Sequence, residues 1–350
     1  MIRTLCSEVP AANGETVQLA GWVHRLRNLG SIVFVQLRDR SGIIQVVLEG
    51  DLAAAPLSLE DVVEVTGQAV AQPRVPGGAE VQARALRIIS HAAPLPFEIN
   101  RKELQAGLDV QLDHRVLSLR HEKPHAALQV QAALIQGFRQ FLMGRGFTEV
   151  HTPKLVATGT EGGSEVFEVR YFDRKAYLAQ SPQFYKQMMV GAGFERVFEV
   201  GPVYRAEEHN TSRHLNEYVS LDVEMGFIRD EEELMDLETE LLRTVFAQVA
   251  ERLPPALALH GAVAPEVGEI PRLPLAEAQE ILLRRYRKAS PPGNLDPDGE
   301  RLICQHIGGP ELLFLTRYPL AKRPMYAMPA HEDAELSASF DLLFRGLEVT

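Results

Sequence analysis

The sequence is poor in cysteine: among 350 residues only Cys6 and Cys304 occur, far apart along the chain. This scarcity argues against a disulfide framework or a cysteine metal site, and it favours the reducing environment of the cytoplasm. Long apolar runs are also missing, as are a secretory signal pattern and a transit-like pattern at the N-terminus. The sequence therefore predicts a cytoplasmic protein that neither spans a membrane nor is exported.

The overall composition is that of a globular protein, with 45% hydrophobic and 24% charged residues. A chain of this length has room for two domains with buried cores. The formal net charge of −11 opposes nucleic-acid binding over the whole surface. It leaves open a local basic patch that contacts phosphate.

The N-terminal part is rich in strand patterns separated by Gly, Pro and Asp turns. The expected strands are Thr16 to Val23, Ser31 to Arg38, Gly42 to Leu48, Val62 to Ala71 and Glu80 to Ile89. Five short strands, with an Ala-rich stretch between the third and the fourth, indicate an OB-fold barrel.

The segment VFEVGPVYRAEEHNTSRHLNEYVSLDVEMGF, from Val197 to Phe227, predicts a hairpin around a polar loop. On its second arm the apolar residues Val219, Leu221, Val223 and Met225 alternate with Ser220, Asp222 and Glu224. A period of two places the carboxylates on one face of the second arm and the apolar groups on the other. By the same rule, Arg205 and Glu207 share one face of the first arm. A solvated hairpin with surface ion pairs is the simpler interpretation. The apolar arms favour burial, however, and charges opposite a buried face are costly unless they serve a ligand.

Several segments resemble the class II aminoacyl-tRNA synthetases, in particular the aspartyl-tRNA synthetases of the archaeal type. YRAEEHNTSRHLNEYVSLDVEMGF is similar to their motif 2, TGTEGGSEVF to their substrate-closing loop, and YLAQSPQFYKQM to their aspartate-recognition segment. GWVHRLRNLG followed by FVQLRDRSGIIQVV resembles their anticodon-binding barrel. The resemblance implies an α+β protein. Its parts would be an OB-fold domain over 1–93, a hinge over 94–120, and a class II catalytic domain over 121–350. That domain is an antiparallel sheet flanked by helices, with a helical insertion at about 262–313.

The activity implied by this resemblance is that of an aspartate–tRNA ligase. Such an enzyme activates L-aspartate with ATP to aspartyl-adenylate and then transfers aspartate to the 3′ end of tRNA-Asp. The protein positions the reactants and neutralises developing charge, together with Mg²⁺ on the ATP phosphates. The archaeal-type branch includes enzymes that also charge tRNA-Asn, and His24 and Pro76 are compatible with that relaxed type.

The resemblance also implies roles for individual residues. Lys186 would meet the substrate side-chain carboxylate, since a buried site built for charge penalises the neutral amide that lacks it. Arg205 would contact the α-phosphate and the substrate carboxylate, and Glu207 the adenine amino group. Arg213 and His214 would bind the outer phosphates of ATP, and Glu217 would orient the tRNA end or the nucleotide. Asp222 would hold the aspartate ammonium, with Glu161 and Gln183 nearby. Glu348 would bind Mg²⁺.

In the barrel, the resemblance implies that Phe34 stacks on an anticodon base and that Gln45 and Glu80 bind base edges. The arginines expected to concentrate positive charge near Phe34 are Arg25, Arg27, Arg38 and Arg40. Basic groups beside a stacking ring are how OB-folds hold unstacked bases. From the pattern alone, Phe34 could equally belong to the core and the arginines to a solvated face.

A helix is expected from Pro124 to Arg145, followed by GFTEVHTPKL. Together these resemble motif 1, which implies a homodimer formed through this segment. Helical periodicity alone fits a core helix of a monomer equally well.

The sequence departs from the family at its end. Beyond the position of Thr350 the family has a metal-binding serine, an arginine for the substrate side chain, and motif 3 with its ATP-stacking arginine, and none of these occurs here. The favoured interpretation is a truncated copy, because residues 341–350 resemble a core strand without a cap. The alternative is a catalytically incomplete paralogue that binds tRNA or regulates. An asparagine-forming paralogue conflicts with the barrel, and an asparaginyl enzyme conflicts with Lys186.

Overall fold

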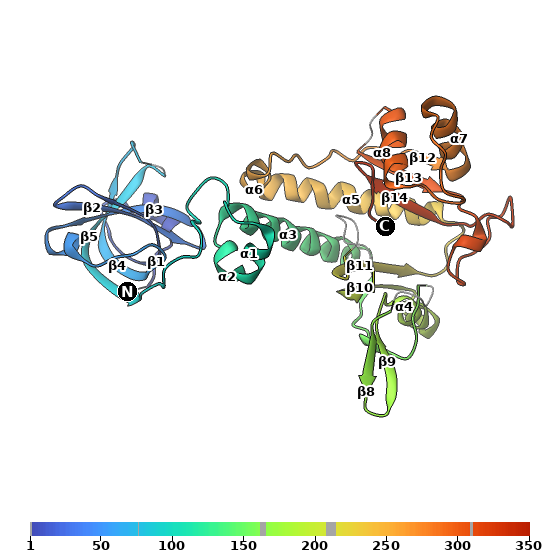
Figure 1. Ribbon diagram of the computed structural model, residues 1–350, viewed down its shortest axis with the longest axis horizontal. Helices are drawn as coiled ribbons and strands as arrows, with labels where there is room; N and C mark the ends of the chain where they lie inside the picture. The colour runs from blue at the N-terminus through green and yellow to red at the C-terminus, as the bar shows by residue number, and fades with distance from the viewer. Residues whose placement is uncertain (1, 76, 162–165, 208–214, 309–310) are drawn as a thin grey trace. The chain divides into compact units, whose positions relative to one another are not determined.

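The structure is a computed structural model that describes residues 1–350 except 1, 76, 162–165, 208–214 and 309–310 (Figure 1). The chain divides into two compact units, Met1–Pro124 and His125–Thr350. Residues 94–120, expected to form a hinge, cluster with the barrel in the first unit. In the described part of the chain, no helix has the length and apolar character needed to cross a membrane.

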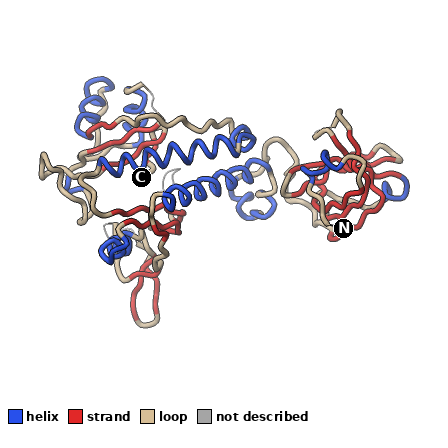
Figure 2. Tube along the Cα trace, turned by 180° about the vertical axis from the view of Figure 1, so that it is seen from behind, coloured by secondary structure: helices blue, strands red, loops and turns tan. Residues whose placement is uncertain are grey.

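Within residues 2–75 and 77–124, five strands form a closed barrel (Figure 2). The strand order is β1-β2-β3-β5-β4, and the β3–β5 pair is parallel. The strands are β1 (Thr16–Asn28), β2 (Ile32–Asp39), β3 (Gly42–Glu49), β4 (Val62–Ala71) and β5 (Ala79–Ser90). Short 3-10 helices lie at Cys6–Ala12 and Gly50–Ala54. The predicted strands are all present, and the predicted OB-fold barrel is confirmed.

Alternate residues of each strand fill the barrel interior. In β2, Val33, Val35 and Leu37 are buried in the core, whereas Phe34 and Gln36 between them point outward. The walls approach closely at Gly67, where a Cβ atom would lie 2.3 Å from the Gln82 carbonyl oxygen. A glycine is therefore required at this position of the barrel wall.

An ion-pair network joins the barrel to the segment that follows it. This segment contains α1 (Leu108–Asp113) and α2 (Arg115–Ser118). The carboxylate of Glu60 is 2% exposed, and its Oε2 accepts hydrogen bonds from Arg38 at 2.7 Å and Arg120 at 2.9 Å. The expectation that Arg38 adds positive charge beside Phe34 is therefore wrong, because its guanidinium is held by a buried carboxylate.

In the second unit, the described residues form three sheets with helices around them (Figure 1). One sheet has the order β11-β10-β6, the second β12-β13-β14-β15, and the third β7-β9-β8. The helices are α3 (Glu122–Gly144), α4 (Gln183–Met189), a π-helical turn (Val190–Phe194), α5 (Glu232–Arg252), α6 (Pro254–Leu259), α7 (Leu275–Tyr286) and α8 (Pro297–His306), with a 3-10 turn at Leu320–Lys322. The strands are β6 (Thr148–Glu149), β7 (Leu155–Val156), β8 (Glu168–Tyr171), β9 (Arg174–Leu178), β10 (Arg196–Tyr204), β11 (Glu217–Met225), β12 (Arg272–Pro274), β13 (Leu312–Thr316), β14 (Phe340–Phe344) and β15 (Leu347–Glu348).

The segment 262–313, expected to be a helical insertion, contains α7 and α8 but also β12 and the start of β13. Strand β13 pairs in parallel with β12 and antiparallel with β14, so the segment is built into a sheet. The physical reason is the apolar run LLFLT: Leu313 packs with the α7 and α8 residues, while Phe314 packs with Met235 of α5. A strand covered on both faces has no alternation to distinguish it from a buried helix.

The predicted hairpin is present as β10 and β11, which pair antiparallel from Arg196 opposite Met225 to Tyr204 opposite Glu217. Its apolar face packs with Phe138 of α3 through Phe198 and Val223. Farther along β11, Val219 and Leu221 are 44% and 42% exposed. The expected burial of this face is therefore correct at one end of the hairpin and wrong at the other.

The ionisation of His24 makes the stability of the barrel depend on pH. Its pKa is lowered to about 4, first by burial and then by the Arg38 guanidinium, whose Nη1 lies 2.9 Å from the His24 Nδ1. Between pH 6.5 and 4 the unfolded chain takes up a proton at this residue and the folded barrel does not, so folding stability decreases as the pH falls through this range.

Trp22 is the single tryptophan and lies in β1, so its fluorescence reports unfolding of the barrel. We expect the urea midpoint of this signal to fall more steeply between pH 6.5 and 4 in the wild type than in His24→Asn. At neutral pH and above, the difference between the two proteins should be constant. Parallel midpoint curves across the acid range would contradict this assignment.

Candidate active site and nucleic-acid interface

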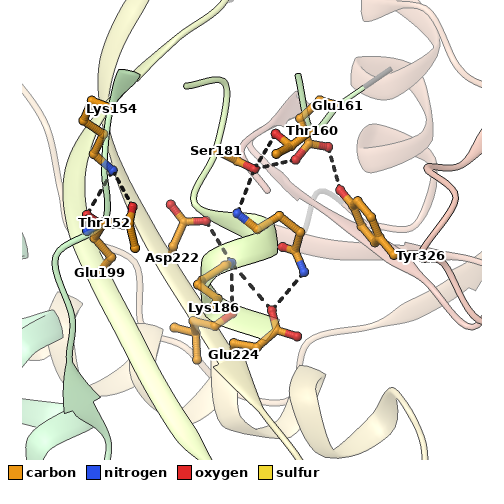
Figure 3. A network of polar contacts seen from close by, with 12 residues as sticks. Thr152, Lys154, Thr160, Glu161, Ser181, Lys186, Glu199, Asp222, Glu224 and Tyr326 are labelled. Carbon is orange, nitrogen blue, oxygen red and sulfur yellow. Dashed lines mark hydrogen bonds and ion pairs between the residues drawn. The ribbon is translucent and has the colours of Figure 1, made fainter. Parts of the chain in front are cut away.

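One face of the β10–β11 hairpin carries a cluster of charges around the buried Lys186 (Figure 3). Lys186 of α4 is 4% exposed, and its Nζ donates to Asp222 Oδ1 at 3.0 Å and to the Val223 carbonyl oxygen at 3.3 Å. The same ammonium lies 3.8 Å from Glu224 Oε2. Asp222 and Glu224 share this face because they are two residues apart on β11. A desolvated lysine between two carboxylates is the central feature of the site.

Helix α4 also brings Gln183 to Glu224. Gln183 and Lys186 are three residues apart, so their side chains lie on one face of the helix. The Gln183 Nε2 donates to Glu224 Oε2 at 3.0 Å. Burial raises the pKa of Glu224, and the nearby Lys186 ammonium acts in the opposite direction. The sequence prediction that Gln183, Lys186 and Asp222 converge is therefore correct in geometry.

Glu161 is held by hydroxyl groups on two sides. Its Oε1 accepts a hydrogen bond from Ser181 Oγ at 2.6 Å, and its Oε2 accepts one from Tyr326 Oη at 2.7 Å. The Gln180 side-chain oxygen accepts from the backbone N–H groups of Thr160 and Glu161 at 3.0 and 3.1 Å. Figure 3 shows Tyr326 reaching Glu161 from the far side of the site. Sequence reasoning did not single out Tyr326, which is 165 residues from Glu161 along the chain.

Arg205 and Glu207 follow β10 and lie near the same cluster. The Arg205 guanidinium carbon is 5.9 Å from the ring centroid of Tyr218. Burial raises the pKa of Tyr218, Arg205 lowers it, and the charges of Asp222, Glu161 and Glu207 raise it further. The charges of all four groups therefore act on one phenol. Among the residues that the structure describes, the buried Nε of Arg205 has no hydrogen-bond partner, so it retains a donor for an anion.

Other predicted residues are placed elsewhere. Arg213 and His214 lie outside the described residues. Glu217 is exposed on the opposite face of β11, where its charge helps to raise the pKa of Tyr204 after the larger effect of burial. Its alternation with Tyr218 and Asp222 directs it away from the cluster, so the structure does not bring Glu217 to the site.

Glu348 lies on the second sheet rather than in the hairpin cluster. It is exposed on β15, next to β14, which carries the buried Asp341. After burial, both carboxylates contribute to the raised pKa of Tyr318. Asp341 was not singled out from the sequence, because a lone aspartate in an apolar strand gives no signal of its own. In the described part of the chain, no group of three or more His, Cys, Asp or Glu residues is arranged to hold a metal ion.

The predicted anticodon residues share the outer face of the barrel. Arg27 is directly opposite Phe34 on β2, Phe34 is opposite Val47 on β3, and Gln45 is opposite Glu80 on β5. Phe34 alternates with buried Val33 and Val35 and is absent from the core cluster of the described residues.

The structure therefore favours a surface role for Phe34 over a core role. Gln45 Nε2 donates to Glu80 Oε2 at 2.8 Å, which fixes these two base-edge candidates together. Arg25, opposite Gln36, donates to the Asn100 carbonyl oxygen. Of the two residues associated with relaxed tRNA choice, His24 contacts Arg38 and Pro76 lies outside the described residues.

Comparisons with known proteins identify the family of both units. Residues 107–350 match the family of tRNA synthetases class II (D, K and N), and residues 17–89 match the OB-fold nucleic acid binding domain. The aspartate–tRNA(Asp/Asn) ligase of Deinococcus radiodurans is 48% identical over 99% of this chain and 81% of its own length. The ligase of the same name from Thermus thermophilus is 48% identical over 100% of this chain and 82% of its own length.

Solved structures give the same result. The asparaginyl-tRNA synthetase from Pyrococcus horikoshii, complexed with asparaginyl-adenylate, superimposes with a TM-score of 0.89 at 30% identity, over 99% of this chain and 82% of that one. The aspartyl tRNA synthetase from Entamoeba histolytica superimposes with a TM-score of 0.85 at 28% identity, over 100% of this chain and 77% of that one. With both family matches and these relatives, the chain belongs to the class II tRNA synthetases, in the aspartate–tRNA ligase family.

Proposed function

We propose that this protein is an aspartate–tRNA ligase that activates L-aspartate with ATP and transfers it to the 3′ end of tRNA-Asp. The observation that carries the proposal is Lys186, a buried ammonium at the carboxylates of Asp222 and Glu224. Its family membership supports the reaction class, and the relatives named aspartate–tRNA(Asp/Asn) ligase support the amino acid.

Aspartate binding follows from the charges of the cluster. Without substrate, Lys186 neutralises Asp222 at 3.0 Å. The substrate brings an ammonium and a side-chain carboxylate, so Asp222 and Glu161 can take the ammonium while Lys186 takes the carboxylate. Gln183 holds the neighbouring Glu224 in place. Asparagine would satisfy the carboxylates but leave the buried Lys186 without an added anion, and this difference selects aspartate.

ATP activation requires positioning and charge neutralisation rather than a protein nucleophile. The substrate α-carboxylate attacks the α-phosphorus in line. The Nε of Arg205, which has no hydrogen-bond partner among the described residues, suits the anionic transition state. Glu207 is assigned to the adenine amino group by family resemblance. Arg213 and His214 are assigned to the outer phosphates by family resemblance.

Mg²⁺ is assigned to the second sheet. Magnesium in nucleotide sites binds one or two carboxylates together with phosphates and waters, so a cluster of three protein ligands is not required. Glu348 is the carboxylate that the resemblance assigns to the ion, and it lies on β15 opposite Leu343 of β14. Asp341 of the same β14 is the neighbouring carboxylate, held 2.8 Å from Arg323. The bound ion would neutralise phosphate charge.

The barrel provides the tRNA interface in this proposal. Phe34 stacks on an anticodon base, Gln45 and Glu80 bind base edges, and Arg25 and Arg27 contact the backbone or a stacked base. The Asp/Asn names of the relatives support charging of tRNA-Asn in addition to tRNA-Asp.

The two cysteines are free and buried, which suits the reducing cytoplasm.

A second candidate function is tRNA binding or regulation through the barrel, which matches the OB-fold nucleic acid binding domain. A catalytically incomplete paralogue would retain the barrel for tRNA binding or regulation without activating aspartate. The intact charge cluster around Lys186 favours the ligase over this alternative.

The direct test is aspartate-dependent ATP–pyrophosphate exchange, measured on the 350-residue chain and on the product of its full reading frame. We expect exchange with aspartate and not with asparagine. Lys186→Met should reduce the exchange kcat/KM by about a hundredfold or more, because a buried charge partner is lost.

Charging assays with the active form should then show aminoacylation of tRNA-Asp and tRNA-Asn. Exchange absent from both forms would favour the binding protein, and uncharged tRNA-Asn would restrict the enzyme to tRNA-Asp.

The anticodon face predicts a separable defect. Phe34→Ala should raise the KM for tRNA by about tenfold, since base stacking on an aromatic ring is worth roughly 1–3 kcal/mol. Aspartate-dependent exchange, which needs no tRNA, should be unchanged. Phe34→Tyr retains the ring and serves as the control. A normal KM for tRNA in Phe34→Ala would remove Phe34 from the interface.

We also propose a homodimer through the motif 1 segment and the hairpin beside it. Exposed apolar side chains occur on α3, where Leu128 and Met143 are 42% and 54% exposed, and on β11, where Val219 and Leu221 are similarly open. Apolar side chains on consecutive elements of a sheet and its covering helix are typical of a protein interface.

The dimer predicts that Leu221→Lys shifts the protein to a monomer, because a charge would be buried at the interface. Sedimentation equilibrium at micromolar concentration measures this change. Leu283→Lys is the matched control, since Leu283 is 58% exposed on α7 and lies outside the proposed interface. If Leu221→Lys kept the mass of the wild-type dimer, or if the wild type were itself a monomer, this interface would be wrong.

A further inference from the structure

A second carboxylate lies directly opposite Asp222 on the hairpin. Glu199 of β10 pairs with Asp222 of β11 in the ladder and is 2% exposed. Side chains directly opposite each other in an antiparallel pair lie on one face, and like charges there destabilise the pair. The buried Glu199 and the half-buried Asp222 therefore each need a cation. Lys186 serves Asp222, which leaves Glu199 to another residue.

The cation of Glu199 is Lys154. Its Nζ lies 2.9 Å from Glu199 Oε1 and 3.2 Å from the Thr152 Oγ1. Thr152 donates to the same carboxylate twice, from its backbone N at 2.9 Å and from its hydroxyl at 2.7 Å (Figure 3). A Cβ on Gly201 would lie 3.4 Å from the Lys154 Nζ and 3.3 Å from Glu199 Oε1, so the missing side chain leaves room for the ion pair.

The backbone of Lys154 connects this ion pair to the aspartate segment. The Lys154 carbonyl oxygen accepts from Ala179 N at 3.0 Å, and the Ala179 carbonyl oxygen accepts from Tyr204 N at 2.9 Å. Ala179 directly precedes Gln180, which holds the backbone of Glu161. Lys154 is therefore tied through its side chain to β10 and through its main chain to the segment that begins the substrate site.

We propose that Lys154 and Glu199 are positioning residues for aspartate binding, an inference that rests on the proposed function. Lys154 neutralises Glu199, so Lys186 remains available to exchange Asp222 for the substrate carboxylate. Without the Lys154 ammonium, an uncompensated buried carboxylate stands opposite Asp222. Lys186, whose side chain is 5% exposed, is then drawn more strongly to the strands and binds the substrate carboxylate less well.

The test uses ATP–pyrophosphate exchange with the form of the enzyme that is active in that assay. Lys154→Met should raise the KM for aspartate by about tenfold or more, while the KM for ATP changes by less than about threefold. The double variant Lys154→Met/Glu199→Gln should recover the aspartate KM to within about threefold of the wild type, because neither charge is left. Glu199→Gln alone should have a small effect, since the Lys154 side chain is 22% exposed and its ammonium can be hydrated.

Lys175→Met is the matched control. Lys175 forms an ion pair with Glu168 at 2.9 Å, but both side chains are exposed, at 70% and 51%. This variant should retain both KM values, because an exposed pair contributes little. Circular dichroism of each variant checks the fold, and if Lys154→Met does not fold, the comparison of Glu199→Gln with the double variant replaces it.

Three results would overturn the inference. Equal changes in the KM for aspartate and ATP would indicate a general structural role, as would a double variant no better than Lys154→Met. If Glu199→Gln is compared with the double variant instead, the two aspartate KM values should be similar. A far higher KM in the double variant would mean that Lys154 acts through something other than the Glu199 charge. Absence of aspartate-dependent exchange in the parent enzyme refutes the proposed function itself, and this inference with it.

Discussion

The antiparallel ladder between β10 and β11 is the constraint on which the catalytic unit depends. Because side chains alternate along each strand, one set of backbone hydrogen bonds packs Phe198 and Val223 with α3 and presents Asp222 and Glu224 to the ligand side. A shift of one residue in this pairing would exchange the two faces and remove both the core contacts and the charge cluster. The stability of the fold and the geometry of the site therefore rest on the same register.

The charge cluster is tolerated because its buried members are paired. A carboxylate or ammonium removed from water costs several kcal/mol unless a partner and hydrogen bonds compensate it. Lys186 with Asp222, and Lys154 with Glu199, meet this requirement side by side. The first pair can exchange partners with a substrate that carries both charges, whereas the second is enclosed by Thr152 and the space at Gly201. In the proposed arrangement, the Lys154–Glu199 pair leaves Lys186 to exchange Asp222 for the substrate.

The two units use strand alternation for different ligands. On the barrel, the outer face presents the ring of Phe34 and the amide of Gln45 above a core of valines and leucines. On the hairpin, the face of Asp222 and Glu224 presents the paired charges that we propose bind a zwitterionic substrate. An aromatic ring with an amide suits a nucleobase, and paired opposite charges suit an amino acid. In the proposed function, each surface therefore binds one of the two substrates of the ligase.

The sequence by itself determined the elements with a clear period: the barrel strands, the long helices α3 and α5, the hairpin, and the family to which its motifs belong. It also indicated Lys186 and Asp222, because they lie in continuous motifs. It missed Tyr326 and Asp341, the strand character of β13, the withdrawal of Arg38 to Glu60 and the outward turn of Glu217. These were decided only by the tertiary structure, because contacts between segments far apart in sequence, burial on both faces of a strand, and the choice of ion-pair partner leave no local pattern to predict them.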